Sequence, residues 1–146
     1  MEPPIAGGFS FRYVETSALV AAGLEGDAAA VRAIRGEGLR IASALTFAET
    51  RRTLAVAVVR GRISPQQLRV RLGWLQRFER RCEVVDVSSS VLARLGRRFP
   101  IEPVRSLDAI HLATIETVEG DPALVAVITR DRRIRENAVA MGYWVE

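Results

Sequence analysis

Short apolar runs, separated by segments with helical spacing, are the feature that most restricts the fold of this chain. Residues 124–128 read Leu-Val-Ala-Val-Ile, an unbroken apolar run that is typical of a strand buried on both faces. Other short runs begin at Phe9, Leu39, Cys82 and Tyr143, with helix-like segments between them. Strands that alternate with helices predict a parallel sheet covered on both faces. We therefore predict an α/β fold, a three-layer α/β/α sandwich with a mainly parallel central sheet.

The expected elements follow from apolar spacing and from residues that begin or end helices. Asp27 is a typical N-cap, and Ser64-Pro65 combines an N-cap with proline at the first helical position. Thr16-Ser17 and Ser106 are predicted to cap two further helices. The expected strands are 9–14, 39–42, 82–87, 124–128 and 143–145. The expected helices run from Thr16-Ser17 through Val20, then over 28–35, 45–59, 65–80, 88–98, 107–118 and 131–140.

Length and composition indicate a single domain over residues 1–146, with residues 1–8 as a flexible leader. The chain has 146 residues, of which 49% are hydrophobic, which is enough for one core. The single cysteine, Cys82, excludes an internal disulfide and a cysteine-based zinc cluster, and it fits a reducing compartment. We find no signal-peptide pattern and no apolar run long enough for a membrane span, so we expect a cytoplasmic protein.

The charge of the chain is modestly positive and comes from arginine alone. The formal net charge is +4, and all 21 basic residues are Arg. Codon usage in a GC-rich genome explains much of this bias. Arginine also binds phosphate through two hydrogen bonds and stacks on bases, so the surface suits nucleic acid.

Four acidic residues fall where the expected strands end or where the next helix begins. Glu15 ends the first strand, and Asp131 follows the strand over 124–128 after two residues. Asp108 and Glu49 lie near the starts of two helices. Because ligands of open α/β sheets bind at the carboxyl ends of the strands, we expect all four side chains at one edge of the sheet.

Carboxylates gathered in this way need a positive counter-charge. Two carboxylates ~4 Å apart repel by roughly 4 kcal/mol at an effective dielectric of about 20, which a cation, arginine side chains or protons can offset. Oxygen ligands select a hard cation, so Glu15, Glu49, Asp108 and Asp131 are predicted to bind Mg²⁺, with Mn²⁺ as a substitute, and to be the catalytic residues. Each acid alone also has a structural explanation, such as a helix cap for Asp131 or the helix dipole for Asp108. A shared function explains all four at once.

Four stretches around these acids resemble the PIN-domain nucleases, and specifically the VapC-type toxins of prokaryotic toxin–antitoxin pairs. The most specific stretch reads Arg-Ser-Leu-Asp-Ala-Ile-His-Leu-Ala over residues 105–113. Together the stretches span nearly the whole chain in the order that the family shows. They are residues 13–20 around Glu15, 43–49 ending at Glu49, 105–113 around Asp108, and 127–133 around Asp131.

The resemblance implies a PIN fold and a metal-dependent endoribonuclease that leaves a 5′-phosphate and a 3′-hydroxyl. It also implies an RNA substrate, a homodimer, and a small antitoxin protein that covers the acidic site. Thr129 and Arg130, next to Asp131, are candidate substrate-binding residues.

Polar residues close to the acids have expected supporting roles. The hydroxyls of Thr16, Ser17 and Thr129 are placed to hold a carboxylate or metal-bound water, although Thr16 and Ser17 also fit as helix caps. His111, the only histidine, is predicted to pack or form hydrogen bonds rather than to act as a general base.

Glu15 departs from the family pattern, which usually has Asp at this position. Glu reaches one methylene further, and octahedral Mg²⁺ is strict about geometry. The alternative function is therefore a PIN-fold module that binds RNA or protein, with weak or lost catalysis. A receiver domain is excluded because it needs a lysine, and a haloacid-type phosphatase because Glu15-Thr16-Ser17 does not supply Asp-x-Asp.

Overall fold

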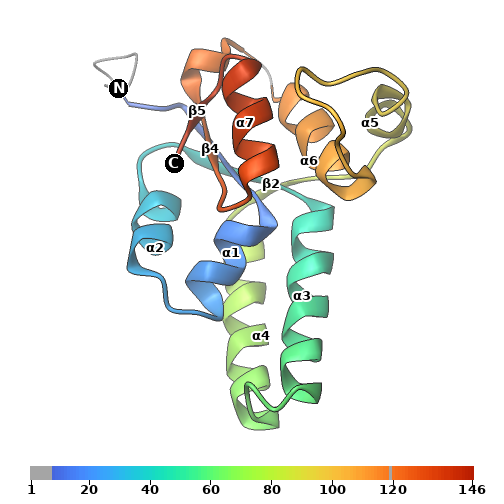
Figure 1. Cartoon of the computed structure of the whole chain (residues 1–146). Helices are drawn as coiled ribbons and strands as arrows, with labels where there is room; N and C mark the ends of the chain where they lie inside the picture. The colour runs from blue at the N-terminus through green and yellow to red at the C-terminus, as the bar shows by residue number, and fades with distance from the viewer. Residues whose placement is uncertain (1–7, 119) are drawn as a thin grey trace.

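The computed structural model describes residues 8–118 and 120–146, which form a five-stranded sheet with helices on both sides (Figure 1). The strand order is β3-β2-β1-β4-β5, and every neighbouring pair is parallel. The predicted α/β fold is therefore confirmed. The leader predicted over residues 1–8 lies outside the described residues, apart from Gly8. The strands are β1 (Phe11–Val14), β2 (Leu39–Ser43), β3 (Glu83–Val85), β4 (Val125–Ile128) and β5 (Trp144–Val145).

Most helices begin and end close to the predicted residues. The carboxylate of Asp27 caps its helix, and Ser64 forms a reciprocal capping box with Gln67 ahead of Pro65. The helices are α1 (Thr16–Gly23), α2 (Ala28–Arg35), α3 (Ala44–Val59), α4 (Pro65–Glu79), α5 (Ser89–Arg94), α6 (Ser106–Glu116) and α7 (Arg132–Ala140), with a 3₁₀ turn η1 (Pro122–Leu124) before β4.

Two of the predicted helix caps were wrong. The N-cap of α1 is Glu15 rather than Thr16 or Ser17, because the Glu15 side chain accepts a hydrogen bond from the backbone N–H of Ser17. Ser106 is already helical, and Arg105 is the N-cap of α6 without a side-chain capping bond. In both cases the residue type was suitable, but the helix begins one residue earlier than the pattern indicates.

Three predicted elements are shorter than expected. The helix expected over 88–98 ends at Arg94, whose guanidinium donates to backbone carbonyls of the following turn before Phe99. The strand expected over 82–87 is an edge strand and pairs with β2 over only three residues. The first strand begins at Phe11 instead of Phe9.

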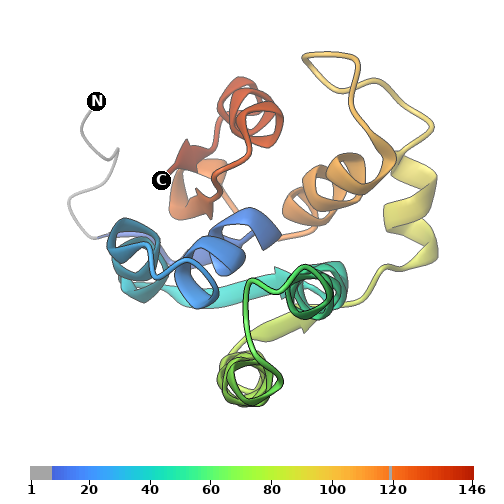
Figure 2. The same cartoon turned by 60° about the horizontal axis from the view of Figure 1, so that its bottom comes forward.

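Alternate side chains of the sheet enter two separate apolar layers. Val14 and Ile128 point into the layer between the sheet and helices α1 to α4. Tyr13 and Val127 point into the layer between the sheet and helices α5 to α7. Figure 2 shows α3 and α4 on the opposite side of the sheet from α6 and α7. This period of two explains why β4 is apolar throughout, since both of its faces are buried.

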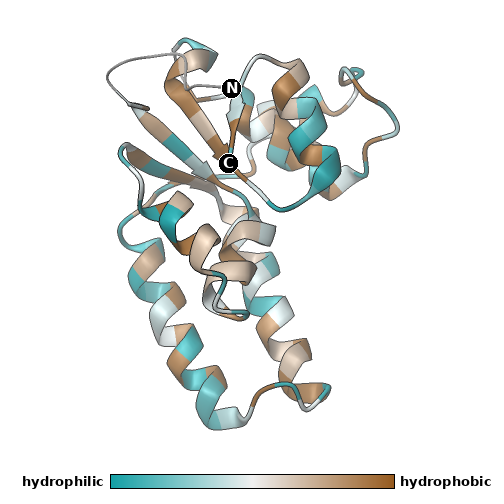
Figure 3. Ribbon diagram, turned by 60° about the vertical axis from the view of Figure 1, so that its left-hand side comes forward, coloured by the Kyte–Doolittle hydropathy of each residue, from teal (hydrophilic) through white to brown (hydrophobic). Residues whose placement is uncertain are grey.

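Helices α3 and α4 extend beyond the sheet as a pair and carry hydrophilic and hydrophobic bands along their length (Figure 3). Their apolar residues include Val59, 87% exposed, and Val70, 67% exposed. Over the described part of the chain, we find no helix whose length and apolar character would let it cross a membrane.

Gly23, the last residue of α1, allows α1 to approach α4 closely. A Cβ atom at this position would overlap three atoms of the Trp74 ring. We predict that Gly23→Ala lowers the free energy of unfolding by about 1–3 kcal/mol, because the ring or the helix must shift. Urea denaturation followed by circular dichroism measures this change.

Gly73, in the middle of α4, provides the matched control. A Cβ there would meet only the mobile end of Arg77 at 3.4 Å. Gly73→Ala should therefore raise the free energy of unfolding by roughly 0.5–1 kcal/mol, as expected for glycine in a helix interior. Equal effects of the two substitutions would contradict the close approach of α1 to α4.

Candidate active site

The carboxyl ends of β1, β2 and β4 lie side by side because these strands are adjacent and parallel. Glu15 directly follows β1, and Asp131 follows β4 after two residues. Glu49 lies on the second turn of α3, which begins immediately after β2. Asp108 lies in the first turn of α6, and its carboxyl interacts electrostatically with Asp131 and Glu49. The structure thus brings all four predicted acids to one edge of the sheet.

The Glu15 carboxylate is buried, with only 4% of the residue exposed. Its Oε2 accepts hydrogen bonds from the backbone N–H of Ser17 at 3.0 Å, from the Ser17 hydroxyl, and from the Thr129 hydroxyl at 2.7 Å. These donors offset the cost of removing a carboxylate from water, and the N-terminus of α1 adds a favourable dipole. Ser17 and Thr129 therefore hold a carboxylate in place, one of the roles predicted for them.

A chain of hydrogen bonds runs from Tyr13 through His111 to Glu49. The Tyr13 hydroxyl lies 2.8 Å from Nδ1 of His111, and Nε2 of His111 lies 2.7 Å from Oε1 of Glu49. An ionised carboxylate only accepts hydrogen bonds, so we assign the imidazole proton to Nε2, and Nδ1 then accepts from Tyr13. The Thr16 hydroxyl donates to the same oxygen of Glu49 at 2.7 Å. The hydrogen-bonding role predicted for His111 is confirmed.

These contacts change the pKa values at both ends of the chain. Burial, together with the negative charge of Glu15, raises the pKa of Tyr13 well above its usual value, so its hydroxyl keeps its proton. Burial also acts to raise the pKa of Glu49, but the hydrogen bonds from His111 and Thr16 outweigh it, and the net change is a lower pKa. Glu49 is therefore an ionised carboxylate with one oxygen fixed.

No local pattern marks Tyr13 as part of this site. It is a fully buried aromatic residue within β1, which by itself suggests only a core position. Its contact with His111 joins residues 98 positions apart in the sequence. Only the fold reveals that the Tyr13 hydroxyl supports the acidic edge.

Asp131 and Asp108 differ in how their charge is balanced. Oδ1 of Asp131 accepts from the backbone N–H groups of Arg133 and Ile134 at 2.8 and 3.0 Å, which makes Asp131 the N-cap of α7. Within the described residues, the Asp108 carboxyl accepts no hydrogen bond. Burial raises the pKa of Asp108, and the charge of Asp131 raises it further. A cation beside Asp108 would relieve this excess of negative charge.

The donor chemistry of this edge fits a hard divalent cation, since the carboxyl groups supply oxygen ligands. Cys82 offers no soft alternative at this edge, because it directly precedes β3 and so lies at the amino ends of the parallel strands. In residues 8–118 and 120–146, no three His, Cys, Asp or Glu side chains are close enough together to hold a metal ion as they stand. Binding would therefore require rotation of side chains such as those of Glu49 and Asp108.

The two candidate substrate-binding residues differ in exposure. Thr129 is fully buried, and its hydroxyl donates to Glu15, so its observed contacts position Glu15. Arg130 is exposed, and its Nε lies 3.5 Å from Oδ2 of Asp27 in a loose ion pair. Its backbone N–H donates to the Ser17 hydroxyl at 2.8 Å, which fixes its main chain beside the acids.

A parallel α/β domain with four acidic side chains at its carboxyl edge defines a class of proteins, and comparison with known families identifies it. The model of the PIN domain family matches residues 12–140. The chain belongs to the PIN-domain family, as its four motifs predict. It is 38% identical over 134 residues to Ribonuclease VapC35 of Mycobacterium tuberculosis, an alignment that covers 89% of this chain and 91% of that protein.

Solved structures of two toxin systems have the same fold. VapBC2 from Rickettsia felis, bound to a DNA fragment from its promoter, matches with a TM-score of 0.59 and 13% identity over 93% of this chain and 97% of the matched chain. VapC20 of Mycobacterium tuberculosis, a toxin that cleaves the sarcin-ricin loop, matches with a TM-score of 0.60 and 18% identity over 90% of this chain and 95% of the matched chain. At these identities the likeness supports the fold alone.

Tyr13→Phe tests the hydrogen-bond chain behind Glu49. Loss of the hydroxyl leaves Nδ1 of His111 buried without a donor, which should lower the free energy of unfolding by about 1–3 kcal/mol. Urea denaturation measures the change. Tyr143→Phe is the matched control, because its hydroxyl forms no hydrogen bond within the described residues, and it should change stability by less than about 0.5 kcal/mol. Equal effects would contradict the proposed role of Tyr13.

Proposed function

We propose that this chain is a metal-dependent endoribonuclease that hydrolyses RNA phosphodiester bonds and is the toxin of a toxin–antitoxin pair. The observation that carries the proposal is the acidic edge around Asp108, in a chain 38% identical to a ribonuclease toxin. Excess negative charge at a sheet edge is costly unless a cation binds there. A bound cation would also let this edge accept a phosphate group.

Glu15, Glu49, Asp108 and Asp131 would hold Mg²⁺, or Mn²⁺ in its place. When bound, the cation supplies Lewis acidity toward the phosphate and lowers the pKa of water. Glu49 keeps one oxygen tied to His111 and Thr16, so its other oxygen is free to bind or to orient the attacking water. Ser17 and Thr129 hold Oε2 of Glu15, which leaves Oε1 as its available ligand atom.

One observation favours the second candidate, a PIN-fold module with weak catalysis. Glu15 is nearly inaccessible, and three donors occupy one of its two carboxylate oxygens. Incubation of the chain with RNA and Mn²⁺, with and without a chelator, separates the two functions. Metal-dependent cleavage supports the nuclease, whereas RNA binding without cleavage supports the binding module.

The partners of the chain are also proposals. A short antitoxin, encoded next to this reading frame, would cover the acidic edge; the related Rickettsia felis structure carries the name VapBC2. A homodimer would bury exposed apolar residues such as Val59 and Val70. We expect the protein to act in the cytoplasm, and light scattering of the purified chain tests the dimer.

Asp108→Asn is expected to separate catalysis from stability. Loss of the carboxylate should reduce RNA cleavage by about a hundredfold or more. The same change should raise the free energy of unfolding without metal, because a raised pKa means that the ionised carboxyl is less stable in the folded chain than in the unfolded chain. Gel-based cleavage and urea denaturation measure the two effects.

Mg²⁺ provides a second readout of this variant. A ligand that binds only the folded state raises the melting temperature, so Mg²⁺ should stabilise the parent more than Asp108→Asn. Asp86→Asn is the control, since Asp86 is exposed and follows the edge strand β3. Parent-like cleavage by Asp108→Asn would refute the catalytic assignment.

A further inference from the structure

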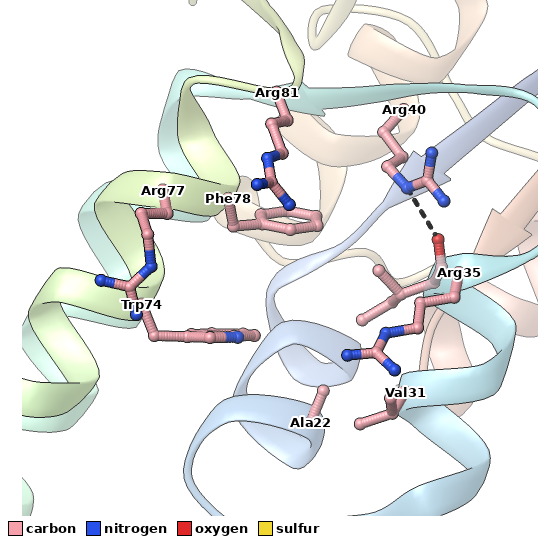
Figure 4. Close-up of a pocket in the computed structure, with 9 residues that line it drawn as sticks. Ala22, Val31, Arg35, Arg40, Trp74, Arg77, Phe78 and Arg81 are labelled. Carbon is pink, nitrogen blue, oxygen red and sulfur yellow. Dashed lines mark hydrogen bonds between the residues drawn. The ribbon is translucent and has the colours of Figure 1, made fainter.

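A second polar site lies in a pocket of about 410 Å³ between α1, α2, β2 and α4 (Figure 4). Its volume is in the range of small-molecule sites. Its floor includes Ala22, Val31 and the buried Ile34, from α1 and α2. The pocket holds none of the four acids of the candidate active site.

Four arginines surround this pocket: Arg35, Arg40, Arg77 and Arg81. Across the described residues, none of them has a carboxylate within ion-pair distance. Arg40 donates to the carbonyls of Ile34 and Gly36 at 3.0 and 3.4 Å, but the other three guanidinium groups donate no hydrogen bond to the described part of the chain. Four guanidinium groups around one pocket, with no carboxylate beside them, give it a positive charge that suits an anionic ligand.

Two aromatic side chains form the wall of the pocket on the α4 side. The rings of Trp74 and Phe78 are stacked, with centroids 6.0 Å apart and planes at 15°. Figure 4 shows both rings projecting from α4 toward α1 and α2. The close approach of Gly23 to Trp74 fixes the position of this ring. Many proteins that bind single-stranded nucleic acid combine aromatic side chains, on which bases stack, with positively charged groups beside them.

We propose that this pocket binds a nucleotide of single-stranded RNA outside the acidic edge, with the base against Trp74 and the phosphates on the surrounding arginines. The arginines come from three elements, α2, β2 and the α4 segment, so their charges match a repeating phosphate backbone better than a single acidic side chain. The choice of RNA as the ligand rests on the proposed function.

Helix α1 connects the pocket to the acidic edge. Thr16, at its first turn, hydrogen-bonds Glu49, and Ala22, near its last turn, lines the pocket. They are six positions apart, a rise of roughly 9 Å along the helix axis at 1.5 Å per residue. This is about the length of three stacked nucleotides at ~3.4 Å each. Measured along the axis of α1, a few nucleotides of one strand span the separation between Ala22 and Thr16.

Binding is best measured in an Asp108→Asn background with chelator, so that cleavage does not interfere. The probe is an unstructured, labelled oligouridylate, titrated by fluorescence anisotropy at several salt concentrations. Arg77→Gln with Arg81→Gln should weaken binding by about tenfold or more. It should also reduce the salt slope by about 1.4, since each phosphate contact on a single strand contributes ~0.7. Trp74→Phe should abolish most of the tryptophan quenching that the probe causes.

The control removes the same charge elsewhere on the surface. Arg69 and Arg97 are exposed and do not line this pocket, so Arg69→Gln with Arg97→Gln should leave affinity and salt slope close to those of the parent. Equal weakening by both pairs would overturn the pocket as a specific site. A second result would also overturn the proposal: the pocket binds an acidic peptide, such as oligoglutamate with leucine residues, and does not bind oligouridylate.

RNA binding at the pocket and RNA cleavage at the acidic edge are measured separately, so each can fail without the other. If the unmodified chain cuts RNA with metal but the Arg77→Gln, Arg81→Gln pair leaves oligouridylate binding unchanged, the pocket proposal is wrong and the nuclease stands. If the pocket binds oligouridylate but the unmodified chain never cuts RNA, the pocket stands and the nuclease is wrong.

Discussion

The buried carboxylate of Glu15 is the interaction on which the acidic edge depends. A carboxylate at the end of a central strand loses most of its water, and this loss is costly without strong donors. Ser17 from α1 and Thr129 from the end of β4 supply those donors. Their hydrogen bonds link the start of α1 to the segment that follows β4, through the carboxylate at the end of β1. One carboxylate therefore caps α1 and accepts from Thr129 at the same time.

A second network joins the two helical layers across the same edge. Tyr13 enters the layer of α5 to α7, and His111 comes from α6 on that side. Glu49 comes from α3, which packs on the other face of the sheet. The imidazole therefore connects a buried phenol on one side to an ionised carboxylate on the other. Any shift of α6 relative to α3 would change the orientation of Glu49.

Local sequence patterns predicted much of this fold because its signals are short-range. The apolar run of β4, the Asp27 cap and the Ser64-Pro65 pair each identify an element from a few neighbouring residues. Strand ends also placed the four acids, since parallel strands share a carboxyl edge. The family followed from the ordered motifs and is confirmed by the match over residues 12–140.

Contacts between distant segments explain what the patterns missed. Tyr13 and His111 lie 98 residues apart, and Arg35 and Arg81 come together only because α2 and α4 flank the same pocket. The Glu15 cap was missed because residue preference alone favoured Thr16 and Ser17, while Thr129 helps to hold Glu15 in its capping position. Tertiary contacts thus decided the cases in which several residues suited one role.

Under the proposed function, the two charged sites place opposite demands on an RNA strand. The acidic edge repels phosphate when no cation is bound, whereas the arginine pocket attracts it. The net charge of +4 hides this division, because acids and arginines gather in different places. A strand held at the pocket would remain close to the acids before a cation neutralises part of the negative charge at that edge. Attraction of RNA would then depend on the arginines of the pocket, and hydrolysis on the acids of the edge. Loss of RNA binding at the pocket need not abolish hydrolysis, and loss of hydrolysis need not abolish binding.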